Sequence, residues 1–282
     1  AYLLYIIIFI LYKNGTPISL WKKSFLFVWL LLSTLLPLAV PVFSLPPPTG
    51  PHPIGTQMFQ WTDSTRMEWF TKENLNDLRK VLAQVWYPSQ RQENRSPVSY
   101  VDHIDIRAKA VGVAGGGLPG ILISHINLVK THSFLNVRAD FTQSPYPVLV
   151  VSHGITGMRQ IHTSLIENLV SHGYVVIAVD HPYDCNLTVF LDETIADYRS
   201  DITGHPDSVK IRRKQLNTRV SDVRFVLDKL SEINFPSMFD GLLDLDRIGV
   251  LGHSYGGATA IQVSYEDVRV RSCLVLDSWM NP

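Results

Sequence analysis

The sequence predicts an α/β fold, namely a mainly parallel sheet with helices on both faces, preceded by one or more transmembrane helices. Two observations predict it. From residue 145 onward, short apolar runs typical of strands buried on both faces alternate with helical patterns. Such alternation implies right-handed crossovers between parallel strands, whose carboxyl ends form the usual ligand-binding edge. An uncharged stretch rich in Leu, Phe and Val near the N-terminus predicts the membrane helix.

The composition limits the possible functions. Of the 282 residues, 46% are hydrophobic, which is enough for one catalytic domain and a membrane segment. The 25 basic and 25 acidic side chains balance, so we expect no nucleic-acid partner. No phosphate-binding glycine loop, metal-ligand motif or dinucleotide fingerprint occurs, so the sequence implies no cofactor and no metal. Cys273 lies in an apolar run and is expected in the core, and its pairing with Cys185 is left open.

Residues 1–45 are predicted to anchor the chain in a membrane. Residues 1–12 are almost wholly apolar but too short to cross a bilayer, so we interpret them as part of a longer helix. Residues 24–45 carry no charge and are long enough to form a transmembrane helix. Because Lys22-Lys23 precede this stretch, the positive-inside rule places the catalytic domain outside the cytoplasm, at the cell membrane. A signal peptide cleaved near Ser44 is the alternative.

A single domain is predicted to follow the membrane segment. Residues 46–57 are proline-rich and are expected to form an extended linker to a domain at 58–282. Residues 79–87 alternate between apolar and polar side chains, as in a half-buried antiparallel strand. Buried strands are then expected at 148–151, 174–179, 248–251 and 268–276, with helices at 161–170 and 216–230. Residues 182–205 have loop character and are expected to contribute to a lid or a pocket wall.

A GxSxG motif stands where an apolar strand gives way to a helix, in the segment Gly252-His-Ser-Tyr-Gly256. Strand, sharp turn and helix in this order are typical of the nucleophile elbow of α/β-hydrolases. The glycines are needed because a side chain at either position would clash where the chain reverses. The motif therefore predicts the α/β-hydrolase fold and makes Ser254 the candidate nucleophile, with a plain glycine turn as the alternative.

A serine nucleophile needs a histidine base, and that base needs a carboxylate to hold its tautomer and offset its charge. Asp277 is the candidate carboxylate, because it stands 23 positions after Ser254 (277 − 254), directly past the strand that follows the motif. A turn aspartate is the alternative. The oxyanion formed on acyl transfer needs amide donors. The amide of Tyr255 is one, and the turn at 152–157 supplies the other, for which we choose Ile155.

No histidine stands in the place that this chemistry requires. The chain order in α/β-hydrolases is serine, acid, histidine, yet all ten histidines precede Asp277. We interpret His153, His181 and His253 as structural or hydrogen-bonding side chains. The first residue is not methionine, and Pro282 closely follows a strand, so we interpret the chain as a fragment. We therefore expect the base beyond Pro282 and expect the fragment by itself to be inactive.

Three segments together resemble the plasma-type platelet-activating-factor acetylhydrolases, that is, the lipoprotein-associated phospholipases and their bacterial, membrane-anchored relatives. The segments are 151–157, 252–259 and 274–280. The resemblance implies calcium-independent hydrolysis of short or oxidised sn-2 acyl esters of phospholipids. The residue roles that it implies are Ser254 as nucleophile, Asp277 as triad acid, the amides of Ile155 and Tyr255 as oxyanion hole, and Trp279 near the acyl pocket.

The predicted function is that of a membrane-anchored serine ester hydrolase, with an ester or lipid substrate and the membrane as partners and with the oligomeric state left open. A general esterase or dienelactone-hydrolase-like enzyme for small esters is the second interpretation. A binding protein with this fold but without catalysis is the third, which the absent histidine permits. The basic cluster from Lys210 to Lys214 is interpreted as a solvated helix face rather than a contact for anionic lipid head groups.

Overall fold

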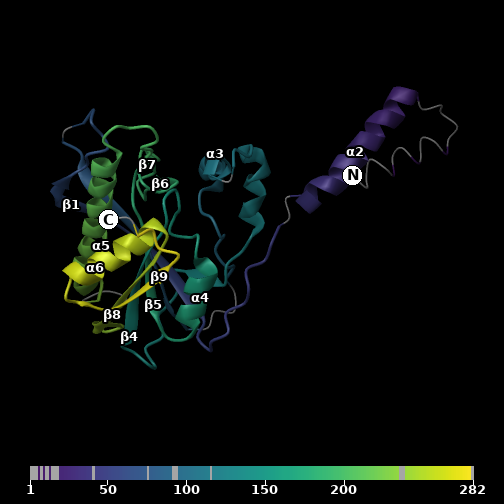
Figure 1. Cartoon of the computed structure of the whole chain (residues 1–282). Helices are drawn as coiled ribbons and strands as arrows, with labels where there is room; N and C mark the ends of the chain where they lie inside the picture. Colours follow the sequence, from purple (N-terminus) through teal and green to yellow (C-terminus); the bar gives the residue numbers. More distant parts are fainter. Residues whose placement is uncertain are drawn as a thin grey trace. The chain divides into compact units, whose positions relative to one another are not determined.

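The computed structural model describes residues 19–39, 42–74, 76–90, 95–114, 116–234 and 239–280, together with Ile6, Phe9 and Lys13. The chain forms two compact units, Ala1–Ser44 and Leu45–Pro282 (Figure 1). The segment 1–12, predicted as part of a helix, lies almost entirely outside the described residues.

The N-terminal unit contains helix α2, Leu20–Ala39. This helix overlaps the predicted transmembrane segment 24–45 but begins earlier, so that Lys22 and Lys23 lie inside it, and it ends before the last apolar residues of that segment. Among the described residues, no helix combines the length and the apolar character that crossing a membrane requires. The predicted span over 24–45 is therefore not found in the part of the chain that the structure describes.

A seven-stranded sheet forms the centre of the C-terminal unit, in the order β3-β1-β2-β5-β4-β8-β9. Its strands are β1 (Ile54–Met67), β2 (Leu78–Pro88), β3 (Ser133–Leu135), β4 (Tyr146–Ser152), β5 (Val175–Asp180), β8 (Leu243–His253) and β9 (Val270–Leu276). Strand β2 runs antiparallel to β1 and β5, whereas β5, β4, β8 and β9 run parallel to one another. A separate hairpin pairs β6 (Leu187–Val189) with β7 (Ile195–Asp197). The predicted, mainly parallel sheet is thus confirmed.

Helices cover both faces of the sheet. Helix α4 (Thr163–Ser171) packs on one face, and α5 (Ser208–Asn234) and α6 (Tyr255–Glu266) pack on the other (Figure 1). Helix α3 (Ile104–Ala114) and two 3-10 turns, Gly120–Leu122 and Ser124–Leu128, precede β3. A helix therefore connects each pair of parallel strands that follow one another in the chain, as the alternating sequence patterns predicted.

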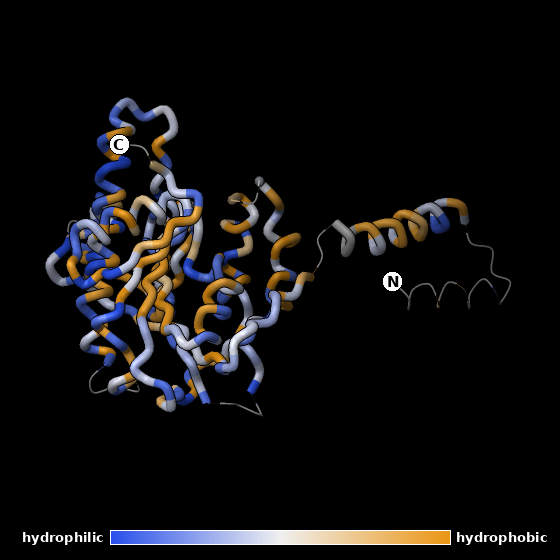
Figure 2. Tube along the Cα trace, turned by 60° about the horizontal axis from the view of Figure 1, so that its bottom comes forward, coloured by the Kyte–Doolittle hydropathy of each residue, from blue (hydrophilic) through white to orange (hydrophobic). Residues whose placement is uncertain are grey.

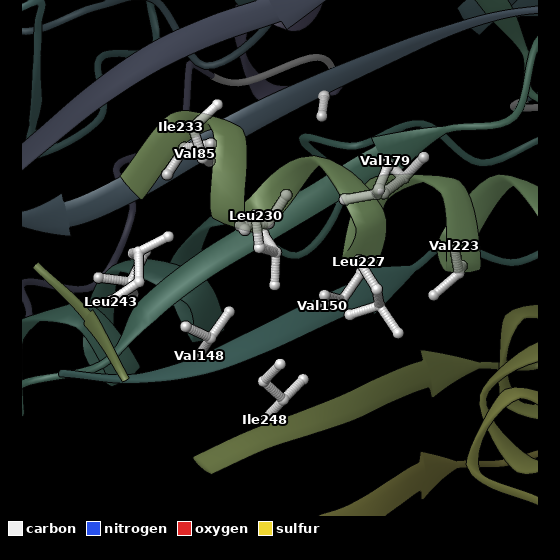
Figure 3. Packing of buried hydrophobic residues seen from close by; sticks show 14 of the residues in the cluster. Val85, Val148, Val150, Val179, Val223, Leu227, Leu230, Ile233, Leu243 and Ile248 are labelled. Atoms are coloured by element: carbon white, nitrogen blue, oxygen red, sulfur yellow. The ribbon is translucent and has the colours of Figure 1, made fainter. Parts of the chain in front are cut away.

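The core consists of two apolar layers, because successive residues of a strand point to opposite faces of the sheet. On the α5 side, Val148, Val150 and Ile248 pack with Leu227 and Leu230 (Figure 3). The layer on the α4 side contains Trp86, Val151, Ile166, Val170, Val176, Ala178 and Leu251. The central strands are correspondingly the most continuous apolar part of this unit (Figure 2). Burial on both faces explains why these strands appear in the sequence as unbroken apolar runs.

Three parts of this unit differ from the sequence prediction. Strand β1 begins at Ile54, inside the segment 46–57 that its prolines predicted to be a linker. Helix α5 begins at Ser208 rather than at 216. The prediction missed its first turns because they are largely basic and contain few apolar residues. The segment 182–205, predicted as a loop, contains the β6–β7 hairpin.

The two cysteines are free, and their surroundings differ from those expected. Cys273 is exposed, so its predicted place in the core is wrong. The reason is that β9 pairs only with β8 in the described part of the chain, and most of its side chains are exposed. Cys185 is fully buried, and its sulfur lies 2.9 Å from the hydroxyl of Thr188.

Candidate active site

The carboxyl ends of the parallel strands meet at one edge of the sheet. Strand β4 ends at Ser152, β5 at Asp180, β8 at His253 and β9 at Leu276. Ser152 pairs with Gly252 across β4 and β8, and His253 pairs with Leu276 across β8 and β9. The segments that come after these strands, which include every predicted site residue, therefore lie along a common edge.

Ser254 lies in the turn between β8 and α6, with a backbone φ of 53°. A positive φ is unfavourable for a residue other than glycine and is a common feature of functional sites. A Cβ atom at Gly252 would lie 2.0 Å from the carbonyl oxygen of Gly256, and one at Gly256 would lie 2.1 Å from that of Ser152. Both glycines are therefore sterically required, for the reason that the motif predicted.

Asp277 follows β9 directly, next to the backbone of Ser254. The amide of Ser254 donates to the carbonyl of Leu276 at 3.0 Å, and the amide of Trp279 donates to the carbonyl of Ser254 at 3.1 Å. These two bonds involve Leu276 and Trp279, which lie on either side of Asp277 in the chain. The φ angle of Asp277 is 46°. Asp277 is exposed, and its carboxylate accepts no hydrogen bond from the residues that the structure describes.

The turn after β4 approaches the nucleophile closely. A Cβ atom on Gly154 would lie 3.3 Å from the Cβ atom of Ser254. Tyr255 is the first residue of α6, so its amide has no acceptor within the helix. Neither this amide nor that of Ile155 donates a hydrogen bond to any atom in the described ranges. The two predicted oxyanion donors are thus free N–H groups in the immediate surroundings of Ser254.

Two pockets adjoin Ser254, and Ile155 lines both of them. The larger has a volume of about 500 Å³ and an apolar wall of Ile155, Ile202, Val209, Leu216, Tyr255 and Trp279. The smaller has a volume of about 360 Å³ and extends towards α3, where Val111, Ala114, Met158 and Ile161 line it. Trp279, which the resemblance placed near an acyl pocket, thus lines the larger pocket together with the serine.

Sequence reasoning missed the arginines of the larger pocket. Arg212 and Arg213 line it from the first turns of α5, in the cluster interpreted as a solvated helix face. The guanidinium of Arg212 lies 5.2 Å from the ring centroid of Tyr255, whereas Arg213 is exposed. Together with Val209 and Leu216, these arginines have the spacing of one helical face. This spacing was the signal in the sequence that places them beside apolar pocket residues.

His181 belongs to a buried hydrogen-bond network behind this edge. Its Nε2 atom lies 2.9 Å from Ser152 Oγ, and its Nδ1 atom lies 2.9 Å from Asp222 Oδ2. Asp222 also accepts two hydrogen bonds from Arg79, at 2.5 and 3.0 Å. All of these side chains are buried, and neither pocket is lined by any of them. Although serine, histidine and aspartate are the residue types of a catalytic triad, this network is structural.

The other histidines near the edge make different contacts. His153 accepts a hydrogen bond at Nε2 from the amide of His181, at 3.3 Å. The rings of His162 and His253 pack edge to face with centroids 5.2 Å apart. In the described part of the chain, no histidine forms a hydrogen bond with Ser254 Oγ.

The buried histidines predict a loss of stability in mild acid. Burial lowers the pKa of His181, and that of His153 well below its ordinary value of 6.5, so both rings are neutral in the folded protein at neutral pH. Below about pH 6.5 the unfolded chain binds protons that the folded chain excludes, so stability is expected to fall as the pH drops through this value. Each unit by which a pKa is lowered contributes about 1.4 kcal/mol.

Urea unfolding at pH 7.5 and at pH 5.5 measures this effect, with the lower midpoint expected at pH 5.5. His181→Asn should reduce the difference between the two midpoints, whereas replacing the exposed His205 by asparagine should leave it unchanged. Equal midpoints of the unchanged protein at both pH values would show that the buried rings do not resist protonation.

A second group of polar side chains has the residue types of a metal site. His153, Asp180 and Cys185 bring potential ligand atoms within 4.8 Å of one another. Asp180 is already bonded to Arg159 at 2.6 Å, and Cys185 to Thr188 at 2.9 Å. Both ring nitrogens of His153 are also bonded, Nδ1 to the carbonyl of Gly154 at 2.6 Å and Nε2 to the amide of His181 at 3.3 Å. These residues therefore form a hydrogen-bonded part of the core and do not fit a metal ion.

Comparisons with known proteins agree with this architecture. Residues 40–282 match the family described as platelet-activating factor acetylhydrolase, isoform II. The chain is 30% identical over 163 residues to the platelet-activating factor acetylhydrolase of dog (Canis lupus familiaris), which covers 50% of this chain and 37% of the relative. It is 24% identical over 244 residues to a probable 1-alkyl-2-acetylglycerophosphocholine esterase of Arthroderma benhamiae, covering 83% of this chain and 59% of the relative.

A solved structure supports the same fold. The ferulic acid esterase from Streptomyces cinnamoneus has a TM-score of 0.63 and 30% sequence identity, over 81% of this chain and 60% of that chain. The chain thus spans between 37% and 60% of the length of these relatives. The family match includes Ser254, Asp277 and the turn after β4, that is, all of the segments that carried the resemblance. The chain therefore belongs to the platelet-activating factor acetylhydrolase family, isoform II.

Proposed function

We propose that the protein hydrolyses carboxylic esters through an acyl-enzyme on Ser254. The observation that carries this proposal is the position of Ser254 itself, a strained serine between two pockets with the free amides of Ile155 and Tyr255 nearby. Backbone strain of this kind costs about 1–3 kcal/mol and is concentrated at active sites and ligand-binding sites. The family membership supports the same reaction.

In the proposed reaction, Ser254 Oγ attacks the carbonyl carbon of the ester while a histidine takes the hydroxyl proton. The amides of Ile155 and Tyr255 stabilise the negative charge that develops on the carbonyl oxygen. The bond between the carbonyl carbon and the alcohol oxygen then breaks, and the alcohol leaves with the proton from the histidine. Water attacks the acyl-enzyme by the same route and releases the carboxylic acid. Asp277 orients the histidine and offsets its positive charge.

We propose that the base histidine comes after Asp277 in the sequence and lies beyond residue 282. The chain order of α/β-hydrolase triads supports this position. The exposed carboxylate of Asp277, which accepts no hydrogen bond from the described residues, is available to such a histidine. On this proposal, residues 1–282 alone lack a base and are inactive.

The preferred substrates are proposed to be short or oxidised acyl esters of phospholipids. The larger pocket supports this class, because it combines apolar residues such as Leu216 and Trp279 with the cations of Arg212 and Arg213. An acyl chain can contact the former, and the guanidinium groups suit a phosphate. Small soluble esters, including those of ferulic acid, are the second candidate class, since a ferulic acid esterase shares the fold at 30% identity.

Hydrolysis of p-nitrophenyl acetate tests the reaction. Residues 1–282 are compared with the same chain extended to its natural C-terminus, and only the extended protein is expected to be active. A substrate panel of a short-chain phosphatidylcholine, its long-chain counterpart and ethyl ferulate then separates the substrate classes, with the highest kcat/KM expected for the short-chain phospholipid. An extended protein that is inert towards every ester would leave the binding-protein interpretation in its place.

We also propose that the protein is attached to a membrane, with the catalytic domain outside the cytoplasm. The support is that α2 exposes large apolar side chains, among them Phe25, Phe27 and Trp29, after the lysines at 22 and 23. The full-length protein is then expected to sediment with membranes and to be released by detergent but not by salt. Recovery in the soluble fraction would contradict this location.

A further inference from the structure

We propose that Arg219 is the positioning residue of the oxyanion hole, because it holds the peptide between Gly154 and Ile155 with its N–H group turned towards the reacting carbonyl. Arg219 lies on α5, far along the chain from this peptide. The inference rests on the proposed function, in which the amide of Ile155 is an oxyanion donor.

The guanidinium of Arg219 contacts both parts of the proposed oxyanion hole. Its Nη1 donates to the carbonyl of His153 at 2.6 Å, and its Nη2 donates to the carbonyl of Gly154 at 3.4 Å. The same group lies 4.9 Å from the ring centroid of Tyr255, the residue that carries the other donor. Asp184 accepts hydrogen bonds from Nε at its carboxylate and from Nη2 at its carbonyl, the latter at 3.3 Å. Arg219 is fully buried, so these contacts hold the plane of its guanidinium group in one orientation.

The ring of His153 holds the same carbonyl of Gly154. Because its Nε2 atom accepts a hydrogen bond from the amide of His181, the proton of the neutral ring is on Nδ1. Nδ1 lies 2.6 Å from the carbonyl oxygen of Gly154 and therefore donates to it. Burial and the positive charge of Arg219 both lower the pKa of His153, which keeps the ring in this neutral form.

These hydrogen bonds determine the direction of the Ile155 amide. In a trans peptide the carbonyl and the N–H group point in opposite directions. The carbonyl of Gly154 points inward to Arg219 and His153 and also accepts a hydrogen bond from the amide of Gly157 at 3.1 Å. The N–H group of Ile155 therefore points outward, on the side of the pockets that Ile155 lines with Ser254. Rotation of this peptide would turn the donor away from the substrate, and loss of one oxyanion donor costs about 10²–10³ in kcat.

Arg219→Lys in the full-length protein tests the proposal. Lysine keeps a positive charge for Asp184, but its compact ammonium lacks the fork that bonds two carbonyls at once. We expect kcat for p-nitrophenyl acetate to fall about 10- to 100-fold, with KM changed by no more than about twofold, because the lost interaction belongs to the transition state. The affinity for a trifluoromethyl ketone, which adds to Ser254 and forms an oxyanion, should fall by the same factor as kcat/KM.

Arg107→Lys is the matched control. Arg107 is equally buried and donates to the carbonyl of Leu187, but it contacts neither oxyanion donor. The same substitution there should lower the melting temperature without the loss of kcat. A kcat of Arg219→Lys equal to that of Arg107→Lys would show that Arg219 has only a structural role and would overturn the proposal.

The crystal structure of Arg219→Lys supplies a readout that does not depend on activity. The peptide between Gly154 and Ile155 is expected to be turned relative to the unchanged protein, and a peptide in the same orientation would contradict the proposal. If Arg219→Lys does not fold, the double variant Arg219→Met, Asp184→Asn removes both charges of the buried pair and allows the same comparisons. If the full-length protein without any substitution has no esterase activity, the proposed function is wrong. The orientation of the peptide between Gly154 and Ile155 would still decide the role of Arg219.

Discussion

Replacing Ser254 by alanine is expected to lower kcat for p-nitrophenyl acetate, in the protein extended to its natural C-terminus, by a factor on the order of 10⁶. In the proposed reaction Oγ of Ser254 is the atom that forms the acyl-enzyme, and Ser254 lines both pockets. The residual rate should still exceed that in water, because the pockets and the amides of Ile155 and Tyr255 remain. The side chain is small and only partly buried, so the melting temperature should stay within about one degree.

The control for this variant is Ser264→Ala. Ser264 lies on α6, the helix that follows the elbow, and its hydroxyl donates to the carbonyl of Ile261 at 2.7 Å. Its replacement should leave kcat and KM unchanged. A fluorophosphonate probe should label the extended protein at Ser254 and should not label Ser254→Ala. If Ser254→Ala retains more than a few per cent of the activity, another residue is the nucleophile and the assignment fails.

Replacing Asp222 by alanine is expected to lower the free energy of unfolding by about 3–5 kcal/mol, the usual cost of removing one partner of a buried ion pair. Asp222 is fully buried and accepts hydrogen bonds from Arg66, Arg79 and His181. Burial alone would raise the pKa of Asp222, but the charge of Arg79 and the hydrogen bond from His181 outweigh it, so the pKa lies well below its usual range. Without this carboxylate, the buried charge of Arg79 keeps Glu68 as its one charged partner among the described residues.

Urea unfolding measures this loss, and Asp228→Ala is the matched control on the same helix. Asp228 pairs with Arg269 at 2.8 Å, but 63% of its side chain is exposed, so its removal should cost no more than about 1 kcal/mol. Asp222→Asn keeps the shape of the side chain but removes its charge, so its loss of unfolding free energy should lie between those of Asp222→Ala and Asp228→Ala. Equal unfolding midpoints for Asp222→Ala and Asp228→Ala would mean that the buried network does not stabilise the fold.

The strands that could be predicted are those covered on both faces. Strands β4, β5 and β8 lie between α4 on one side and α5 and α6 on the other, so nearly every position must be apolar, and the runs are visible in the sequence. Strand β1 could not be found in this way, because many of its side chains are only half buried and its pattern mixes polar and apolar residues. Its place depends on the antiparallel register with β2, which is a tertiary property.

The prediction of a membrane helix shows that the ends of a helix are also hard to predict from sequence. An uncharged stretch indicates how apolar a segment is, but not where the helix that contains it begins. In the structure α2 includes Lys22 and Lys23 and ends at Ala39, so it does not coincide with the uncharged window 24–45. Helix boundaries depend on local capping and on the residues just outside the helix, and these are the least predictable part of a sequence pattern.

The candidate site also has one part that the sequence could predict and one part that it could not. Ser254 and its glycines could be predicted because the steric requirement of the elbow acts between neighbouring residues. The contacts behind the site could not, because they join distant segments: His181 bonds a residue 41 positions away, and Arg219 bonds a carbonyl 66 positions away. For Arg219 in particular, the sequence shows only one more basic residue on a long polar helix.

By itself, the sequence determined the order of the buried strands and helices, the elbow with Ser254, and the position of Asp277 directly after the strand beyond it. Only the tertiary structure decided that Cys273 is exposed, that His181 is bonded to Ser152 and Asp222, and that Arg219 holds the carbonyls of the oxyanion loop. The physical reason is that periodicity and steric exclusion act over a few residues, whereas a buried polar group takes its partners from whichever segments the fold brings around it.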